Sequence, residues 1–452
     1  MTEQQGNKYQ GARLSHRHHM RIHWKEFFKS DENTLAKEVT LVEKGSLVGR
    51  IGLMLLICGT GAWRVRDSMD SVARKLGITC SADIGLVSIE YTCFDVKNAS
   101  YSQALSLPTT GVNMTKLNAL EEFVRQFKEG HGHWTLGQIH RRLDEIDQMK
   151  SIYSPRVAGL AAGLACAGFI FLLGGGIPEV FCAFFGAGIG NFVRAQLGKH
   201  KITLVAKIAI AVAMACLVYD LVFVLVHQLI GVRPSHLYGY IGAMLFVIPG
   251  FPFITAGLDM AKLDMRSGLE RLAYAILVIV IATMTGWAVA IILHLSPGAI
   301  PKVNLSLPLL TLFRLLASFC GVFGFSLMFN SSVKMAAMAA VIGAIANTVR
   351  LSLVELLLLP GGLAAFIGAL IAGLIASFVR DRVGYPRIAL TVPAIVIMVP
   401  GLYMYRAVFN LGMTNLTVGA LWLTQTLLIV TALPLGLLAA RMVTDKKWRK
   451  VD

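Results

Sequence analysis

Two Pro-Gly pairs stand about midway along long apolar segments of this sequence, Pro249-Gly250 and Pro400-Gly401. Proline removes a backbone N–H and clashes with the preceding helical turn, and glycine lets the chain leave helical geometry. Inside lipid such a break is tolerated only where it is buried or lines a cavity. Opened helix ends offer N–H groups to a carboxylate and C=O groups to an ammonium ion. The matched pairs therefore predict a substrate site near the middle of the spans, and a simple kink is the alternative.

Neighbouring side chains extend this predicted site. Phe251, Pro252 and Tyr403 follow the breaks and are expected to shape the cavity. Asn191 and Asn347 occupy equivalent places in two similar segments and are added as predicted substrate-binding residues.

Two aspartates in apolar segments are candidates for proton coupling. Asp220 lies late in the third predicted span, and Asp259 ends the fourth. Ionisable residues within spans are functional candidates by default, because placing them in lipid is costly. The alternative for each is an interfacial pair with a neighbouring Arg or Lys.

No constellation for covalent chemistry is visible. The N-terminal region has no nucleophile–base pair and no metal-ligand spacing, and the spans have no His/Asp or Ser/His cluster. We expect no catalytic residue, no metal and no cofactor, and the chain is predicted not to be an enzyme.

The composition indicates where these residues must be held. Hydrophobic residues make up 55% and charged residues 15% of the 452 residues, with a mean hydropathy of +0.64. Soluble domains usually carry about 25% charged residues. These values exclude a disordered chain and argue against a cytosolic enzyme. Segments of about 20 apolar residues predict ten transmembrane helices, at residues 157–174, 177–194, 204–226, 238–258, 271–293, 307–329, 335–356, 362–379, 387–408 and 417–440.

The charges predict the orientation of these spans. With Arg156 in the cytoplasm, the inner segments of the membrane region carry fifteen Lys and Arg, and the outer loops carry two, Arg233 and Lys302. This asymmetry satisfies the positive-inside rule and places both termini in the cytoplasm. The formal charge of +16 then reflects topology, and we expect no nucleic-acid partner.

The ten spans divide into two similar groups of five. Ile189-Gly190-Asn191-Phe192-Val193-Arg194 resembles Ile345-Ala346-Asn347-Thr348-Val349-Arg350, and the Pro-Gly pairs match at a similar offset. A repeat with five crossings places its second copy upside down. We therefore predict two inverted five-helix repeats, at 157–293 and 307–440, which is the architecture of many alternating-access carriers.

The region before the spans has ordinary soluble character. Residues 1–41 are polar and aperiodic and predict a flexible basic tail, and residues 441–452 predict a basic cytoplasmic tail. Amphipathic helical patterns and an alternating segment at 87–93 predict a small cytoplasmic α+β domain over 42–150. The first residues show no signal peptide.

Several motifs together resemble the threonine/serine exporter family over residues 42 to 440. In the soluble region they are Gly59-x4-Arg64-Val65, Gly111-Val112-Asn113 and Arg142-Leu143-Asp144-Glu145-Ile146. In the membrane region they are Pro249-Gly250-Phe251-Pro252 with Asp259, and Pro400-Gly401-x3-Tyr405-Arg406. Arg66 departs from the family pattern, in which an acidic residue often follows Arg-Val.

The resemblance implies a secondary transporter in the bacterial inner membrane that exports L-threonine and L-serine, driven by the proton gradient. Its partners would be this small-molecule substrate and the lipid bilayer, and homo-oligomerisation is left open. A membrane-embedded sensor or regulatory protein, a carrier for another small metabolite and transport in the uptake direction are the alternatives.

Overall fold

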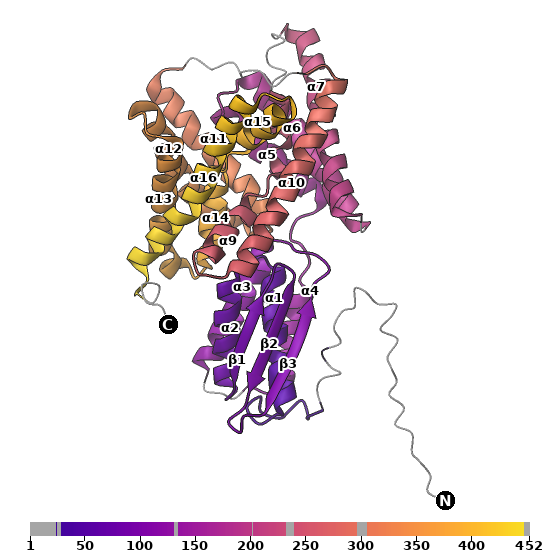
Figure 1. Ribbon diagram of the computed structural model, residues 1–452, viewed down its shortest axis with the longest axis vertical. Coiled ribbons are helices and arrows are strands. Elements are labelled where there is room, and N and C mark those ends of the chain that lie inside the picture. Colours follow the sequence, from indigo (N-terminus) through magenta and orange to yellow (C-terminus); the bar gives the residue numbers. More distant parts are fainter. Residues whose placement is uncertain are drawn as a thin grey trace, which may run out of the picture.

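The computed structural model describes Trp24 and residues 29–130, 134–200, 202–231, 239–295 and 305–446. An α+β domain lies at one end of a larger helical body (Figure 1). Most of the predicted tail at 1–41, and the tail at 441–452 beyond residue 446, lie outside the described residues.

The domain is built on a three-stranded antiparallel sheet. Strands β1 (Thr79–Ile84), β2 (Ser88–Phe94) and β3 (Ser100–Ser106) lie in the order β1-β2-β3. In β2, Ile89, Tyr91 and Cys93 are buried and alternate with more exposed residues, as the sequence pattern predicts. The sequence analysis did not identify β1, because most of its side chains are polar or only half-buried and give no alternating apolar signal.

Four helices complete the domain: α1 (Leu41–Ile57), α2 (Ala62–Lys75), α3 (Met114–Glu129) and α4 (Leu136–Gln148). Helix α1 packs against β2 and β3, α2 packs against β1, and α3 contacts both α1 and α2. The apolar segment of α1, too short to span a bilayer, forms the centre of this core, where Leu47, Ile51 and Leu55 are at most 1% exposed.

The folded domain begins before residue 42. Ala36 and Val39 are buried against the domain, and Leu35 forms a β-bridge with Thr135. Residues from about 29 onward, assigned from the sequence to the tail, therefore pack as part of the domain.

The helical body contains α5 to α16. Its bounds are α5 (Pro155–Leu172), α6 (Ile177–Lys199), α7 (Leu204–Ile230), α8 (Tyr240–Met244) with the 3₁₀ turn η4 (Leu245–Val247), α9 (Gly250–Met260), α10 (Met265–Ile292), α11 (Leu307–Met328), α12 (Val333–Leu356), α13 (Gly361–Val383), α14 (Arg387–Val396), α15 (Gly401–Gly412) and α16 (Leu416–Thr444).

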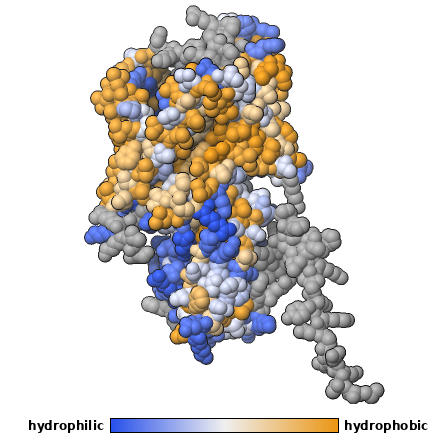
Figure 2. All heavy atoms as spheres, in the orientation of Figure 1, coloured by the Kyte–Doolittle hydropathy of each residue, from blue (hydrophilic) through white to orange (hydrophobic). Residues whose placement is uncertain are grey.

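The body has the length and surface of a multi-pass membrane protein. Among the described residues, eight helices are long and apolar enough to cross a membrane. Two bent pairs, α8–η4 with α9 and α14 with α15, also pass this test, which raises the number to ten if each pair is one span. In Figure 2 hydrophobic residues dominate the visible face of the body, and hydrophilic residues gather on the domain.

The first five predicted spans and the last five have the same internal contacts. In the first group α5 packs on α6, α6 on α7, and α7 on α10. In the second group α11 packs on α12, α12 on α13, and α13 on α16. The bent pairs also correspond, because α9 packs on α10 as α15 packs on α16.

Helices α5 and α11 join the two groups through a reciprocal contact. A Cβ on Gly168 would lie 2.5 Å from the carbonyl oxygen of Ala317, and one on Gly324 would lie 2.3 Å from that of Ala161. Phe169 and Phe325 meet beside them, with ring centroids 6.4 Å apart. Glycine is required at this crossing because the two backbones approach too closely for any side chain.

Candidate functional site

The two Pro-Gly pairs produce nearly identical breaks. Pro249 has φ −81° and ψ 57°, and Pro400 has φ −82° and ψ 58°. At each proline the following glycine N–H donates to the carbonyl two residues before it, at 2.8 Å and 2.9 Å. These are inverse γ-turns, whose central residue has a φ that the proline ring favours. The chain bends by 51° at the first break and by 52° at the second.

The breaks lie against each other. A Cβ on Gly250 would be 3.2 Å from Val399, and one on Gly401 would be 3.1 Å from Ile248. A cavity of about 10 Å³ lies between them, which is about the space of one water molecule. The structure therefore brings together the two motifs that the sequence matched, in a conformation with no room for a solute between them.

A much larger cavity of about 400 Å³ opens beside the first break. The break itself lines it, from Val247 to Pro252, together with parts of α6, α7, α10 and α11. Thr110, Gly111 and Val112 of the domain also line it, so the cavity lies at the domain end of the body. Its volume is in the usual range for small-molecule sites.

Two cations dominate the electrostatics of this cavity, which we call the break cavity. Arg194 near the end of α6 and Lys207 in the first turn of α7 line it, and no acidic side chain of the described residues does. The guanidinium carbon of Arg194 lies 5.4 Å from the ring centroid of Phe246, at cation–π distance. Within the described part of the chain, neither cation has a carboxylate at ion-pair distance.

The positive end of a helix dipole adds to these charges. Helix α9 begins at Gly250, and the residues of its first turn line the cavity. A helix N-terminus favours an anion through its dipole and its first N–H groups. In α9 the Gly250 N–H already donates to Ile248 and Pro252 has no N–H, so the dipole and the Phe251 N–H make this contribution. The arrangement can therefore bind a small solute through a carboxylate.

The other predicted substrate residues hold helices together. The Asn191 amide donates to the carbonyl of Ala158 at 2.7 Å and ties α6 to α5. The Asn347 amide donates to Ser318 at 2.9 Å and ties α12 to α11 in the same way. The Tyr403 ring on α15 contacts the Trp422 ring on α16 in a tilted arrangement, with ring centroids 4.8 Å apart. None of these three side chains lines the break cavity.

The two candidate aspartates lie in different surroundings. Asp220 is half-buried on α7 and has no hydrogen-bond or ion-pair partner among the described residues. Asp259 is fully buried and pairs with Arg271, with Nε and Oδ2 3.1 Å apart. Its carboxylate also accepts from the Ala62 N–H at 3.0 Å and from the Ser267 hydroxyl at 2.9 Å.

This buried pair joins the body to the domain. While Asp259 accepts from Ala62 at the start of α2, Arg271 donates to the carbonyl of Thr60 at 2.9 Å. A Cβ on Gly61 would lie 2.7 Å from the Asp259 carboxylate, so the glycine permits this approach. The Gly-x4-Arg-Val segment is thus the place where the domain meets α9 and α10.

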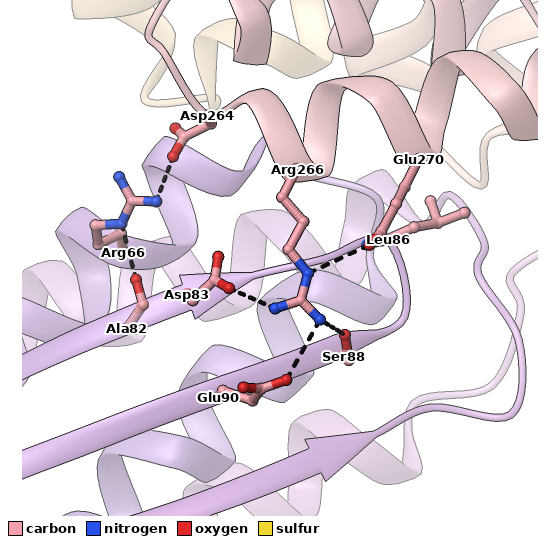
Figure 3. Close-up of polar contacts among 9 residues, drawn as sticks. All are labelled: Arg66, Ala82, Asp83, Leu86, Ser88, Glu90, Asp264, Arg266 and Glu270. Carbon is pink, nitrogen blue, oxygen red and sulfur yellow. Dashed lines mark hydrogen bonds and ion pairs between the residues drawn. The ribbon is translucent and has the colours of Figure 1, made fainter.

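Further ion pairs, each with an exposed arginine, join the domain to the same turn (Figure 3). Arg266 at the start of α10 reaches Asp83 and Glu90 on β1 and β2, and Arg66 on α2 pairs with Asp264. Arg66, which departs from the family pattern, therefore has a partner on the body. These contacts dock the β1–β2 hairpin on the turn between α9 and α10.

The sequence analysis did not assign Arg194, Lys207 and Phe246 to the site. Arg194 was counted only among the charges that report orientation. An ionisable side chain in an apolar segment was the available signal, but sequence spacing could not place it beside a break some fifty positions away. The sequence analysis also missed a contact between Tyr240 on α8 and Tyr405 on α15, whose hydroxyl oxygens lie 2.8 Å apart.

Comparisons with known proteins agree with the resemblance in the motifs. A threonine/serine exporter family model matches residues 46–294, and a second, described as "Threonine/Serine exporter, ThrE", matches residues 314–443. The "Probable threonine/serine exporter" of Mycobacterium tuberculosis is 24% identical over 431 residues, covering 86% of this chain and 73% of the relative. The "Probable succinate transporter subunit YjjP" of Escherichia coli is 24% identical over 241 residues, covering 53% of this chain and 90% of the relative. No solved structure matches.

Proposed function

Because the chain belongs to the threonine/serine exporter family, we propose that it is a secondary transporter that exports L-threonine and L-serine across the bacterial inner membrane. The observation that carries the proposal is the break cavity, which reaches Pro249-Gly250 from the domain end and holds two cations. Arg194 binds the substrate carboxylate, and backbone carbonyls at the break receive the ammonium group.

An inverted pair of five-helix repeats gives this site its two access routes. The matched breaks, the matched helix contacts and the reciprocal crossing of α5 and α11 support the repeat. Five crossings invert the second copy, so rocking one group against the other would expose the breaks to each side in turn. The break cavity lies at the domain end and represents the inward-open state.

The topology inferred from the charges places the domain and both termini in the cytoplasm. Two of the predicted inner segments, at Asp259–Arg271 and at Asn330, contact the domain directly. Arg387 and Arg441, from two more inner segments, lie beside Trp63 and Arg64 of the domain. Four predicted inner segments thus share one end of the body with the domain, which supports this orientation.

Counterflow in liposomes tests the carrier and its carboxylate site. Vesicles that contain the purified protein and unlabelled threonine should accumulate labelled threonine, and Arg194→Gln should slow this about tenfold or more, because it removes a charge-assisted hydrogen bond. Lys199→Gln is the matched control, since Lys199 is an exposed cation at the end of the same helix. Equal rates in Arg194→Gln and the control would refute the role of Arg194, and no counterflow with any amino acid would refute the amino-acid carrier.

A dicarboxylate is the second candidate substrate. Two cations and no acid line the break cavity, which suits two carboxylates better than a zwitterion, and one relative is named as a succinate transporter subunit. Unlabelled succinate should then compete with labelled substrate in the same assay, and Lys207→Gln should weaken competition by succinate more than competition by threonine. An equal effect on both would exclude the dicarboxylate.

Proton coupling is assigned to Asp220 rather than to Asp259. Asp220 is half-buried without a partner among the described residues, whereas Asp259 is held by Arg271, Ser267 and the Ala62 N–H. We expect Asp220→Asn to abolish the stimulation of transport by a pH gradient while counterflow without a gradient remains. Stimulation that survives in Asp220→Asn but disappears in a folded Asp259→Asn variant would reverse the assignment.

A further inference from the structure

Three guanidinium groups converge on a second cavity, of about 40 Å³, between the domain and the body. Arg64 comes from α2, Arg387 from the first residue of α14 and Arg441 from the last turn of α16. Figure 1 shows α14 and the end of α16 on the side of the body that faces the domain. We call this the arginine cavity; it is separate from the break cavity and shares no lining residue with it.

An indole ring holds two of the three cations in place. The guanidinium carbon of Arg441 lies 4.1 Å from the ring centroid of Trp63, and that of Arg64 lies 5.0 Å from it. Both distances are within the range of cation–π attraction. Trp63 itself lines the cavity, so it reports directly on what enters it.

Positive charge exceeds negative charge around this cavity. Arg64 pairs with Glu121 on α3, and the Nε of Arg441 lies 3.7 Å from Asp445. Neither carboxylate lines the cavity, and no other acidic side chain that the structure describes lines it. The cavity wall is therefore cationic, with its counter-charges behind it.

Arg387 is the cation that most requires a partner. It is 7% exposed and donates only to neutral groups, the carbonyl of Gly373 at 3.3 Å and the hydroxyl of Thr444 at 3.1 Å. Among the side chains that the structure describes, no carboxylate lies at ion-pair distance from it. It also stands at a helix N-terminus, where the dipole disfavours a cation and favours an anion. A buried charge without a counter-ion is costly.

We propose that the arginine cavity binds a phosphate group, carried by an anionic lipid headgroup or by a soluble phosphate compound. The planar fork of arginine suits phosphate oxygens, and the cavity has space for about three water molecules, the scale of one oxyanion. The site bridges the domain, through Arg64, to the body, through Arg387 and Arg441. A bound phosphate therefore stabilises the docked domain, whatever the transported substrate is.

Ligand titration of the purified full-length protein in neutral detergent tests the site. Inorganic phosphate, and separately short-chain phosphatidylglycerol, are added against chloride of equal ionic strength and against phosphatidylcholine. The expected result is a saturable rise in the thermal unfolding midpoint with a saturable change in tryptophan fluorescence. A response to inorganic phosphate identifies a soluble ligand as the source, and a response to phosphatidylglycerol alone identifies a lipid.

Variants locate the response. Arg387→Gln should weaken the affinity about tenfold or more, and Trp63→Phe should remove the fluorescence change while the thermal response remains. Because Arg387 is buried and its variant could misfold, Arg441→Lys, which keeps the charge and loses the fork, serves as the second variant. Lys199→Gln, an exposed cation elsewhere on the domain side, is the control. A response no greater than with chloride or phosphatidylcholine, or one that Arg441→Lys and Lys199→Gln change equally, would overturn the proposal.

Discussion

At the scale of single residues, two buried carboxylates, Asp259 at the junction and Glu43 in the domain, each have several partners. Asp259 and Arg271 satisfy each other and also hold backbone groups of residues 60–62. The Glu43 carboxylate likewise holds backbone groups, here those at the start of the domain. Its carboxylate accepts from the N–H groups of Lys29, Ser30 and Thr40 and from the hydroxyls of Ser30 and Thr40.

Glu43 makes the packing of the first domain residues dependent on pH. Burial tends to raise the pKa of its carboxyl group, but the hydrogen bonds from Ser30 and Thr40 outweigh this and lower the pKa from 4.5 to about 2. A lowered folded-state pKa means that the contribution to stability is complete above about pH 4.5 and is lost as the pH falls towards 2. We expect the backbone amides of residues 29–40 to lose protection against hydrogen exchange as the pH falls through this interval.

The substitution Glu43→Gln should cause the same loss of amide protection at neutral pH. We expect it to reduce the stability of this packing by about 1–3 kcal/mol. Glu38→Gln is the control, since Glu38 is exposed. Exchange in 29–40 that is independent of both pH and Glu43 would contradict this role.

At the scale of elements, short backbone features determine how helices meet. The inverse γ-turns at Pro249 and Pro400 bend two spans by nearly the same angle and place them in contact. Glycines then set the distance between neighbouring helices. At the crossing of α5 and α11 the close contact is made twice, by Gly168 and Gly324, each against a backbone carbonyl of the other helix.

Alanine at either of these glycines should destabilise the body. The added Cβ would lie 2.5 Å or less from a carbonyl oxygen, and backbone cannot rotate away as a side chain can, so we expect a loss of about 1–3 kcal/mol for each. Thermal unfolding of the purified protein measures it. Gly361→Ala is the control, because its Cβ would make only an ordinary contact at 3.6 Å. Midpoints for Gly168→Ala and Gly324→Ala that equal the control would mean that the two helices separate freely.

At the scale of the whole molecule, two turns of the body hold the domain in addition to the residues around the arginine cavity. One is the turn between α9 and α10, and the other contains Asn330 between α11 and α12. The Asn330 amide donates to Asn113 at 2.9 Å, and its oxygen accepts from Ser151 at 3.0 Å and from the Ile152 N–H at 2.8 Å. One side chain thus holds the start of α3 and the linker that leads into α5.

Replacing Asn330 should loosen the domain without unfolding it. Asn330 has φ 57°, so Asn330→Ala loses the hydrogen bonds and is also strained, whereas Asn330→Gly loses only the hydrogen bonds. We expect faster protease cleavage in residues 149–154 for both variants, and the fastest cleavage for Asn330→Ala. The lost hydrogen bonds should weaken the docking of the domain by about 1–3 kcal/mol.

The control is Asn98→Ala, which changes an asparagine of similar φ, 59°, in the turn between β2 and β3. Cleavage of Asn330→Gly at the wild-type rate would show that the Asn330 side chain does not hold the domain.

Much of this architecture could be predicted from the sequence, because it depends on local chemistry. A run of about 20 apolar residues favours lipid whatever surrounds it, and the two bent spans follow from the φ of proline and the freedom of glycine at Pro249-Gly250 and Pro400-Gly401. The alternation in β2 likewise appears in the chain itself. Strand β1 has no such pattern and was missed.

Only the tertiary structure decided which of these features form a site. Asp259 meets Ala62, which lies 197 positions away, and Arg194, Lys207 and Pro249 line one cavity from three helices. The sequence analysis placed Asn191 and Asn347 in the substrate site, and the structure shows them bonded between neighbouring helices. Hydropathy and backbone preference act within a few residues, whereas a cavity depends on how distant helices pack. That packing turned a charge that reported only orientation, Arg194, into the best candidate for binding a carboxylate.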